Sequence, residues 1–223
     1  MNTGTHIKCY WGSGSAPSWR VLICLKEKSL HDANLILLSM SDNEHKAPDV
    51  LKINPRGQLP AFQDGDVIIN ESIAICHYLA DTYDDQGSAL FPKDAIQRGL
   101  VYQRIHEIQN LYGKVMNLTR YYWKRKPYYT NNVVSEKKAE LMIEIKLWDT
   151  YINNGFVVGS EFSLADVCLF PVIAFMNRLG MDLSAYPQID TFYNRHITRQ
   201  SIQETWPPHW KESRNKTIFK RVL

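Results

Sequence analysis

The pattern of apolar residues changes about one third of the way along this chain of 223 residues. Up to residue 84, short apolar runs of strand length alternate with segments of helical periodicity, and from residue 94 the periodicity is helical throughout. A chain of this length suffices for one large domain or two small ones. We therefore predict an α/β domain over residues 1–84, a polar linker over 85–93 and an all-helical domain over 94–223.

The order of elements in the first domain predicts a mixed four-stranded sheet with helices on its faces. Asp64-Gly65 separates two apolar runs, which is a strong short-range signal for a β-hairpin. The predicted strands are 6–11, 34–38, 59–63 and 67–70, and the predicted helices are 18–28 and 71–83, with a short helical turn inside 39–50.

The second domain is predicted from long helical patterns and one capping motif. Ser163 and Asp166 have the spacing of a capping box, in which each side chain accepts the main-chain N–H of the other residue. The helix that follows has an apolar stripe typical of a buried core face. Other helices are predicted at 94–126, 133–152, 188–197 and 201–206.

Charge gives no indication of a nucleic-acid partner. Residues 1–84 carry 7 Lys/Arg and 10 Asp/Glu, and the whole chain has a formal net charge of only +3. The stretch "TRYYWKRKPYY", residues 119–129, mixes basic and aromatic residues, but it lies in a helical pattern that proline ends. We interpret its basic residues as a solvated helix end.

Cysteine usage and hydropathy predict a cytoplasmic protein with no metal site and no membrane partner. No apolar run approaches the ~18 residues that suggest a membrane span, and the N-terminus lacks the apolar core of a signal peptide. The cysteines show neither CxxC nor metal-ligand spacing, so we expect buried free thiols at Cys9, Cys24, Cys76 and Cys168.

Several separated motifs resemble one known family in their order along the chain. The segments are "GQLPAF" at 57–62, "NES" at 70–72 and "SLADV" at 163–167. Over roughly residues 6–210 the chain resembles a cytosolic glutathione S-transferase, and "WGSGSAPSWRVLI" and the tail "TWPPHW" are most similar to the rho class, near the theta and zeta classes. The resemblance implies a thioredoxin-like first domain with a cis bond before Pro60, and a homodimer.

The implied activity is conjugation of the glutathione thiolate to electrophilic small molecules, as in detoxification. Glutathione is then the co-substrate, and no cofactor is implied. Ser15 falls where serine classes of this family hold the hydroxyl that stabilises the thiolate. Ser13 and Ser18 are alternatives, and Ser18 is also interpreted as a helix cap. Because "SAPS" contains no thiol, conjugation is favoured over disulfide reduction.

The resemblance also implies which residues contact glutathione. Glu71 and Ser72 would bind the γ-glutamyl ammonium and carboxylate at the start of a helix. Leu59, before Pro60, would pair with the cysteinyl backbone. The remaining implied contacts are Pro60 itself, Gln58 and His45.

An electrophile pocket is expected between the segment 11–15 and the inner face of the long helix. Its implied residues are Trp11, Ser13, Tyr112, Met116, Arg120 and Phe175. Two alternative functions stay open. One is a non-catalytic member of the family that binds ligands or assembles with other proteins. The other is a related glutathione chemistry, such as peroxide reduction, dehalogenation or isomerisation, which uses the same thiolate.

Overall fold

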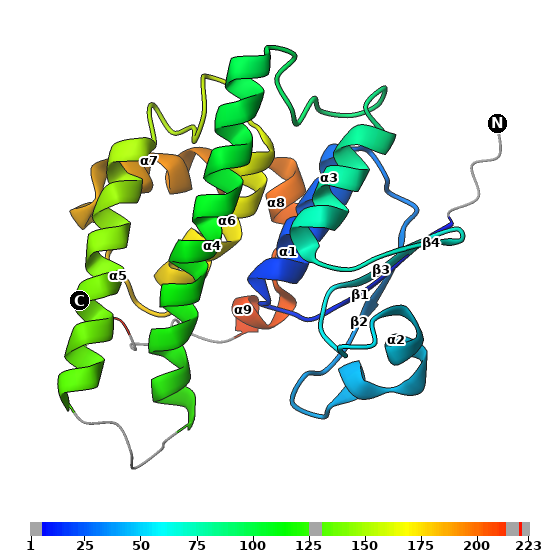
Figure 1. Ribbon diagram of the computed structural model, residues 1–223, viewed down its shortest axis with the longest axis horizontal. Helices are drawn as coiled ribbons and strands as arrows, with labels where there is room; N and C mark the ends of the chain where they lie inside the picture. Colours follow the sequence, from blue (N-terminus) through cyan, green and yellow to red (C-terminus); the bar gives the residue numbers. More distant parts are fainter. Residues whose placement is uncertain (1–5, 125–130, 213–218, 220–223) are drawn as a thin grey trace. The chain divides into compact units, whose positions relative to one another are not determined.

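The computed structural model describes residues 6–124, 131–212 and 219 (Figure 1). These residues form two compact units. The first contains residues 6–91 and 199–212, and the second contains residues 92–124, 131–198 and 219.

The first unit contains a small sheet and the helices that cover it. Its strands are β1 (Ile7–Trp11), β2 (Asn34–Leu37), β3 (Ala61–Asp64) and β4 (Val67–Ile69). Its helices are α1 (Ala16–Glu27), the 3-10 turn η1 (Glu44–Lys46), α2 (Pro48–Ile53), α3 (Ser72–Thr82), α8 (Gln200–Glu204) and α9 (Pro208–Glu212).

In the described residues, the sheet has four strands in the order β2-β1-β3-β4. The central strand β1 pairs in parallel with β2 and antiparallel with β3, and β3 pairs antiparallel with β4. Asp64 pairs with Val67 across the turn at Gly65, whose φ of 56° suits glycine. The mixed sheet and the hairpin at Asp64-Gly65 are therefore confirmed.

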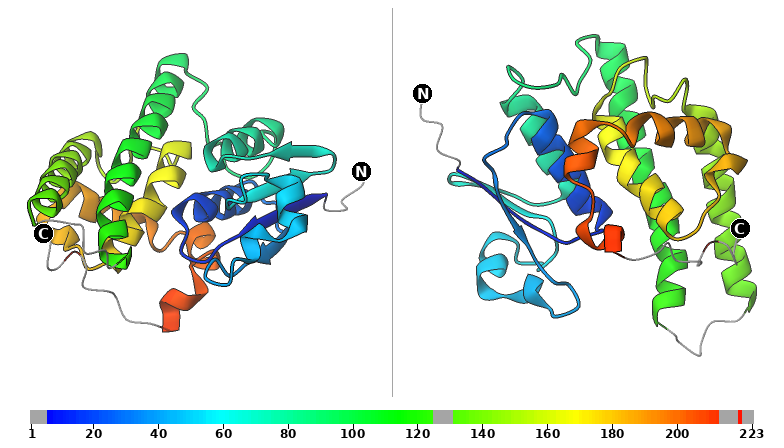
Figure 2. Two further views of the ribbon diagram at one scale, coloured as in Figure 1. Left: turned by 60° about the horizontal axis from the view of Figure 1, so that its bottom comes forward. Right: turned by 180° about the vertical axis from the view of Figure 1, so that it is seen from behind.

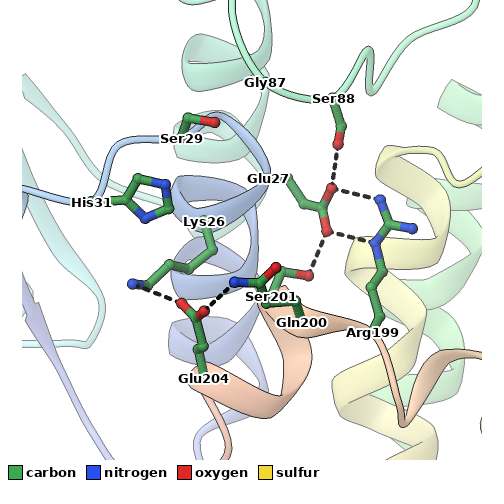
Figure 3. A pocket seen from close by; sticks show the side chains of 10 residues that line it. All are labelled: Lys26, Glu27, Ser29, His31, Gly87, Ser88, Arg199, Gln200, Ser201 and Glu204. Carbon is green, nitrogen blue, oxygen red and sulfur yellow. Dashed lines mark hydrogen bonds and ion pairs between the residues drawn. The ribbon is translucent and has the colours of Figure 1, made fainter.

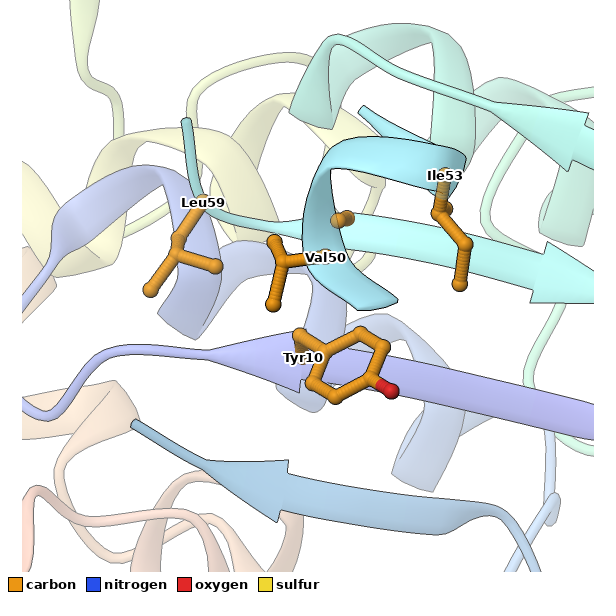
Figure 4. Close-up of a cluster of buried hydrophobic side chains, with 5 residues drawn as sticks. Tyr10, Val50, Ile53 and Leu59 are labelled. Carbon is orange, nitrogen blue, oxygen red and sulfur yellow. The ribbon is translucent and has the colours of Figure 1, made fainter. Parts of the chain in front are cut away.

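The two faces of this sheet are covered by different helices. Tyr10 and Ala61 are register partners, and both pack with Val50 and Ile53 of α2 and with Leu59 (Figure 4). Successive side chains of a strand point to opposite faces, so the neighbouring pair Cys9 and Phe62 faces away from α2. Accordingly, the Phe62 ring contacts Tyr78 of α3, and α3 packs against α1 on this side (Figure 2).

The second unit is helical in its described residues, as predicted. Its helices are α4 (Ala95–Lys124), α5 (Asn131–Tyr151), α6 (Leu164–Arg178), the 3-10 turn η2 (Leu183–Ala185) and α7 (Pro187–His196). One side of α4 is fully buried at intervals of three or four residues, at Val101, Ile105, Ile108, Leu111, Val115 and Leu118. This stripe packs α4 against α5 and α6.

The predicted capping box is confirmed at the start of α6. The carboxylate of Asp166 accepts the main-chain N–H of Ser163 at 2.8 Å and that of Val157 at 2.9 Å. Among the described helices, none combines the length and hydrophobicity needed to cross a membrane.

Three predicted element starts are wrong by two residues. Helix α5 begins at Asn131 rather than Val133. Helix α1 begins at Ala16 rather than Ser18, and Pro17 lies in its first turn, where a missing N–H costs nothing because that position has no intrahelical acceptor. Strand β3 begins at Ala61, after the cis peptide bond between Leu59 and Pro60, so residues 59–60 are not part of it.

Two segments beyond residue 84 pack within the first unit. Gly87 and Ser88 contact the end of α1: the N–H of Ser88 donates to the carbonyl of Glu27 at 2.7 Å, and a Cβ atom at Gly87 would lie 2.1 Å from that oxygen. Residues 199–212, which we predicted in the helical domain, belong to the first unit because their polar and aromatic side chains are bonded to α1. The predicted helix end at 125–126 lies outside the described residues.

Candidate active site

Ser15 lies at the junction of β1 and α1. It is the N-cap residue of α1, and its Oγ accepts the N–H of Ser18 at 3.4 Å. Its main-chain N–H donates to Gly12 at 3.2 Å, which closes a tight turn. A hydroxyl that accepts in this way keeps its own proton, and no described group accepts that proton. The half-buried Ser15 hydroxyl can therefore donate a hydrogen bond to a ligand at the positive end of α1.

The two alternative serines have different surroundings. Ser18 is fully buried, and its Oγ accepts the N–H of Gly12 at 3.3 Å. The prediction that Ser18 caps the helix is wrong, because Ser15 occupies that position. Ser13 is half-buried, and its Oγ lies 2.6 Å from Nδ1 of His209.

Leu59 is held next to the loop that carries Ser15. The Leu59 side chain is buried in the cluster with Tyr10 and Val50 (Figure 4), and a Cβ atom at Gly12 would lie 3.4 Å from its Cδ1. The peptide bond to Pro60 is cis, as predicted. No hydrogen bond among the described residues engages the N–H or C=O of Leu59. This main-chain pair can therefore bind an extended peptide.

Glu71 and Ser72 lie at the start of α3. Glu71 has a φ of 72°, which is uncommon for a residue other than glycine and occurs often in functional sites. Its carbonyl accepts the N–H of Ile75, so the N–H groups of the first turn have no intrahelical acceptor. The guanidinium of the buried Arg20 donates to the Ser72 hydroxyl at 3.4 Å. Positive charge and N–H groups therefore meet at this helix end, which favours a carboxylate.

Of the predicted residues, His45 lies in the 3-10 turn η1, and Gln58 lies in the loop between α2 and β3. Asn54 Nδ2 donates to the carbonyl of Gln58 at 2.9 Å, which shapes the loop and leaves the Gln58 side chain exposed. Lys46, next to His45, donates from Nζ to the carbonyl of Arg56 at 3.1 Å and so connects η1 with this loop. Among the described residues, the buried Nδ1 atom of His45 has no hydrogen-bond partner.

The residues predicted to line the electrophile pocket lie on both units. Trp11 and Ser13 are half-buried in the first unit. Tyr112, Met116 and Arg120 follow one another at four-residue intervals on α4, so they share one side of that helix. Phe175 is half-buried on α6. The pocket itself stays a prediction.

The protein's own thiols are not placed for nucleophilic chemistry. All four cysteines are buried and free, as predicted. Burial raises the pKa of Cys9, on β1, to about 12, so its thiol stays neutral at physiological pH. In the described part of the chain, no group of three acidic, histidine or cysteine side chains could hold a metal ion.

Sequence reasoning missed the contribution of α9 and Arg20 to this region. The Trp19 indole donates to Thr205 at 2.9 Å, and its ring meets those of Trp206 and Trp210 at centroid distances of 5.2 and 5.5 Å. Gly14 is in contact with His209, because a Cβ atom at Gly14 would lie 2.8 Å from Cε1 of the histidine. The motif "TWPPHW", residues 205–210, indicates only a resemblance to the rho class. Its dense aromatic content is the one sequence signal that this segment packs against another element, which the structure shows to be α1.

Comparisons with known proteins match both parts of the chain to one family. The family model described as "Glutathione S-transferase, N-terminal domain" matches residues 14–82, and "Glutathione S-transferase, C-terminal domain" matches residues 111–200. Glutathione S-transferase A of Pleuronectes platessa is 42% identical over 207 residues, which cover 91% of this chain and 92% of that protein.

Solved structures with the same fold include two transferases from invertebrates. A glutathione S-transferase from the Antarctic clam Laternula elliptica is 40% identical, with a TM-score of 0.90 over 98% of this chain and 100% of that one. A delta-class glutathione transferase of Nilaparvata lugens is 27% identical, with a TM-score of 0.79 over 97% and 100% of the two chains. Because both domain models match in order and the identity extends along nearly the whole chain, this protein belongs to the glutathione S-transferase family.

Proposed function

We propose that this protein conjugates glutathione to electrophilic small molecules and that the Ser15 hydroxyl stabilises the reacting thiolate. The observation that carries the proposal is the bonding of Ser15, whose oxygen caps α1 while its proton remains available. In the reaction, the thiolate sulfur attacks an electrophilic carbon and forms a C–S bond. The leaving group departs with its electron pair, and the thiol proton passes to solvent.

The energetic demand on Ser15 is modest. A free thiol has a pKa near ~8.5, so most of it is protonated at neutral pH. A hydrogen bond to a charged group is worth roughly 1.5–3 kcal/mol, and one pKa unit corresponds to ~1.36 kcal/mol. One hydroxyl at the N-terminus of α1 therefore suffices to lower the thiol pKa by about one to two units.

The rest of glutathione would lie along the groups described above. Its cysteinyl backbone would pair with the main chain of Leu59, before the cis bond to Pro60. Its γ-glutamyl carboxylate would bind Ser72 and the first N–H groups of α3, and its ammonium would bind Glu71. His45 and Gln58 would face the glycine end of the molecule.

Further features follow from membership of the family. We propose a homodimer with a cytoplasmic location, an electrophile pocket at the six residues named above, and a place in the rho class. The two domains would be residues 1–84 and 94–223, except that the segment 199–212 packs in the first unit.

The test combines retention on immobilised glutathione with turnover of a chlorinated nitrobenzene. Retention with turnover supports a conjugating enzyme. Retention without turnover of this substrate, of a peroxide or of a haloalkane would indicate a non-catalytic member of the family. Turnover of a peroxide or a haloalkane alone would assign one of the related glutathione chemistries.

A further inference from the structure

We propose that His209 is a positioning residue for thiol activation, acting through Ser13 on the loop that carries Ser15. The proposal rests on the proposed function of Ser15. Its starting point is the distance of 2.6 Å between Ser13 Oγ and His209 Nδ1, from residues at opposite ends of the first unit's sequence. This is a short hydrogen bond, and it lies two residues from the proposed activating hydroxyl.

Helix α9 lies in contact with the loop itself. A Cβ atom at Gly14 would lie 2.8 Å from Cε1 of His209 and 2.9 Å from Nε1 of Trp210, so these two side chains leave no space there. Gly14 also has a φ of 74°, which favours glycine. The loop conformation and the packing of α9 over it therefore depend on each other.

The segment that carries His209 is fixed to α1 along its length. The Arg199 guanidinium donates to the Glu27 carboxylate at 2.6 and 2.7 Å, and the hydroxyl of Ser201 also bonds to it (Figure 3). These residues border a pocket of about 410 Å³. Further along, Thr205 accepts the indole N–H of Trp19 at 2.9 Å. His209 thus reaches Ser13 from an anchored segment.

The carbonyl of Ser15 accepts the N–H of Trp19 at 2.8 Å, but the bonds at its hydroxyl and its N–H are long. The cap bond from Ser18 measures 3.4 Å and the turn bond to Gly12 measures 3.2 Å, against about 2.9–3.0 Å for a typical N–H···O bond. A group that activates a substrate must be held within about 0.5 Å of its working position. The shorter Ser13–His209 bond supplies the additional restraint. This hydrogen bond can form with either neutral tautomer of His209, because the serine hydroxyl can both donate and accept.

The experiment compares the wild type with four variants of the Ser13–His209 pair, with the control variant His31→Phe and with Ser15→Gly. His209→Phe keeps a ring over Gly14 but removes Nδ1, and His209→Asn restores a polar atom near the position of Nδ1. Ser13→Ala removes the other partner of the bond, and the double variant combines Ser13→Ala with His209→Phe. His31→Phe is the control, because His31 is an exposed histidine of the same unit near the opposite end of α1.

Two quantities are measured for each variant: the dissociation constant of glutathione, and the pH titration of its bound thiol by the ultraviolet absorbance of the thiolate. At pH values below the thiol pKa, we expect His209→Phe to lower the fraction of bound glutathione that is present as thiolate by about threefold to tenfold. The dissociation constant of glutathione should stay within about twofold of the wild-type value. Ser13→Ala should give the same loss, and the double variant should add little to either single change. His209→Asn should recover most of the thiolate, and His31→Phe should match the wild type.

Each other result has a definite meaning. If His209→Phe and Ser13→Ala leave the titration unchanged while Ser15→Gly raises the thiol pKa, the positioning role is wrong and the proposed function stands. If the double variant loses as much thiolate as the two single variants together, the positioning role is also wrong, because the effects of two residues that act through one bond are not additive. If Ser15→Gly itself leaves the titration unchanged, the proposed function fails, and this inference fails with it. Should His209→Phe not fold, Ser13→Ala and His209→Asn decide the question.

Discussion

The oxygen of Ser15 accepts the main-chain N–H of Ser18 at 3.4 Å, so one hydroxyl both ends the β1–α1 loop and caps α1. Capping uses a lone pair of this oxygen, whereas activation of a thiolate would use its proton. The two roles can therefore be separated by substitution, because glycine is a tolerable N-cap and alanine is a poor one.

Ser15→Gly and Ser15→Ala should lose the same amount of activity but different amounts of stability. Both lack the hydroxyl, so conjugation near pH ~6.5 should fall roughly ten- to a hundredfold, and raising the pH should recover part of it. Alanine should lower the free energy of unfolding by about 0.5–2 kcal/mol and glycine by only a few tenths. Steady-state rates against pH and urea denaturation measure the two effects.

Ser15→Thr is the matched control for this pair, because it keeps both the hydroxyl and a capping oxygen. It should retain most of the activity at low pH. A wild-type pH–rate profile in Ser15→Gly would show that another group stabilises the thiolate.

Substitutions at the start of α3 should weaken glutathione binding more than turnover. Glu71→Gln removes the negative charge proposed to bind the γ-glutamyl ammonium, and Ser72→Ala removes the hydroxyl proposed to bind the carboxylate. Each should raise the KM for glutathione about tenfold, since a hydrogen bond to a charged group is worth roughly 1.5–3 kcal/mol. The kcat should change little, because this part of glutathione does not react.

Asp81→Asn provides the control, since Asp81 is an exposed acid on the same helix. It should leave both constants unchanged. A fall in kcat with an unchanged KM in Glu71→Gln or Ser72→Ala would contradict the assignment of these residues.

Acid should destabilise the protein in part through Glu27. Burial raises the pKa of this carboxyl, but hydrogen bonds from Arg199, Ser201 and Ser88 outweigh burial and hold the pKa below its ordinary value of 4.5. The unfolded chain therefore binds the proton first as the pH falls. The stabilisation is present above about pH 4.5 and is lost as the pH falls through the folded pKa.

Glu27→Gln should lower the free energy of unfolding at neutral pH and make its decrease at acidic pH smaller. We expect a decrease of about 1–2 kcal/mol at pH ~7, because water screens part of the attraction at the partly exposed Arg199. Urea denaturation at several pH values measures it. Glu204→Gln is the control, because Glu204 forms a more exposed pair with Lys26 at 3.0 Å and should change the acid profile little. Equal acid losses in wild type and Glu27→Gln would refute this account.

Assembly gives a further prediction. We expect a two-fold dimer in which α3 and α4 supply the interface. Light scattering at micromolar protein concentration should then give twice the chain mass of 25.9 kDa. A monomeric mass together with full conjugating activity would count against the dimer.

The sequence by itself determined the features that depend on neighbouring residues. Asp64-Gly65 specified the hairpin, because a tight turn between two apolar runs leaves few alternatives. Ser163 and Asp166 specified the start of α6, because the two partners of a capping box are three residues apart. The ordered motifs around Pro60, Ser72 and Asp166 specified the family.

The tertiary structure decided which of several equivalent residues takes each role. The sequence alone does not distinguish the roles of Ser13, Ser15 and Ser18. Only the start of α1 at Ala16 makes Ser15 the N-cap residue and leaves Ser18 buried. Likewise, nothing local in the sequence indicates that His209 bonds Ser13 across 196 positions. Such contacts form only when the whole domain packs, because the loss of chain entropy in joining distant residues is offset by burial and hydrogen bonding along the entire segment.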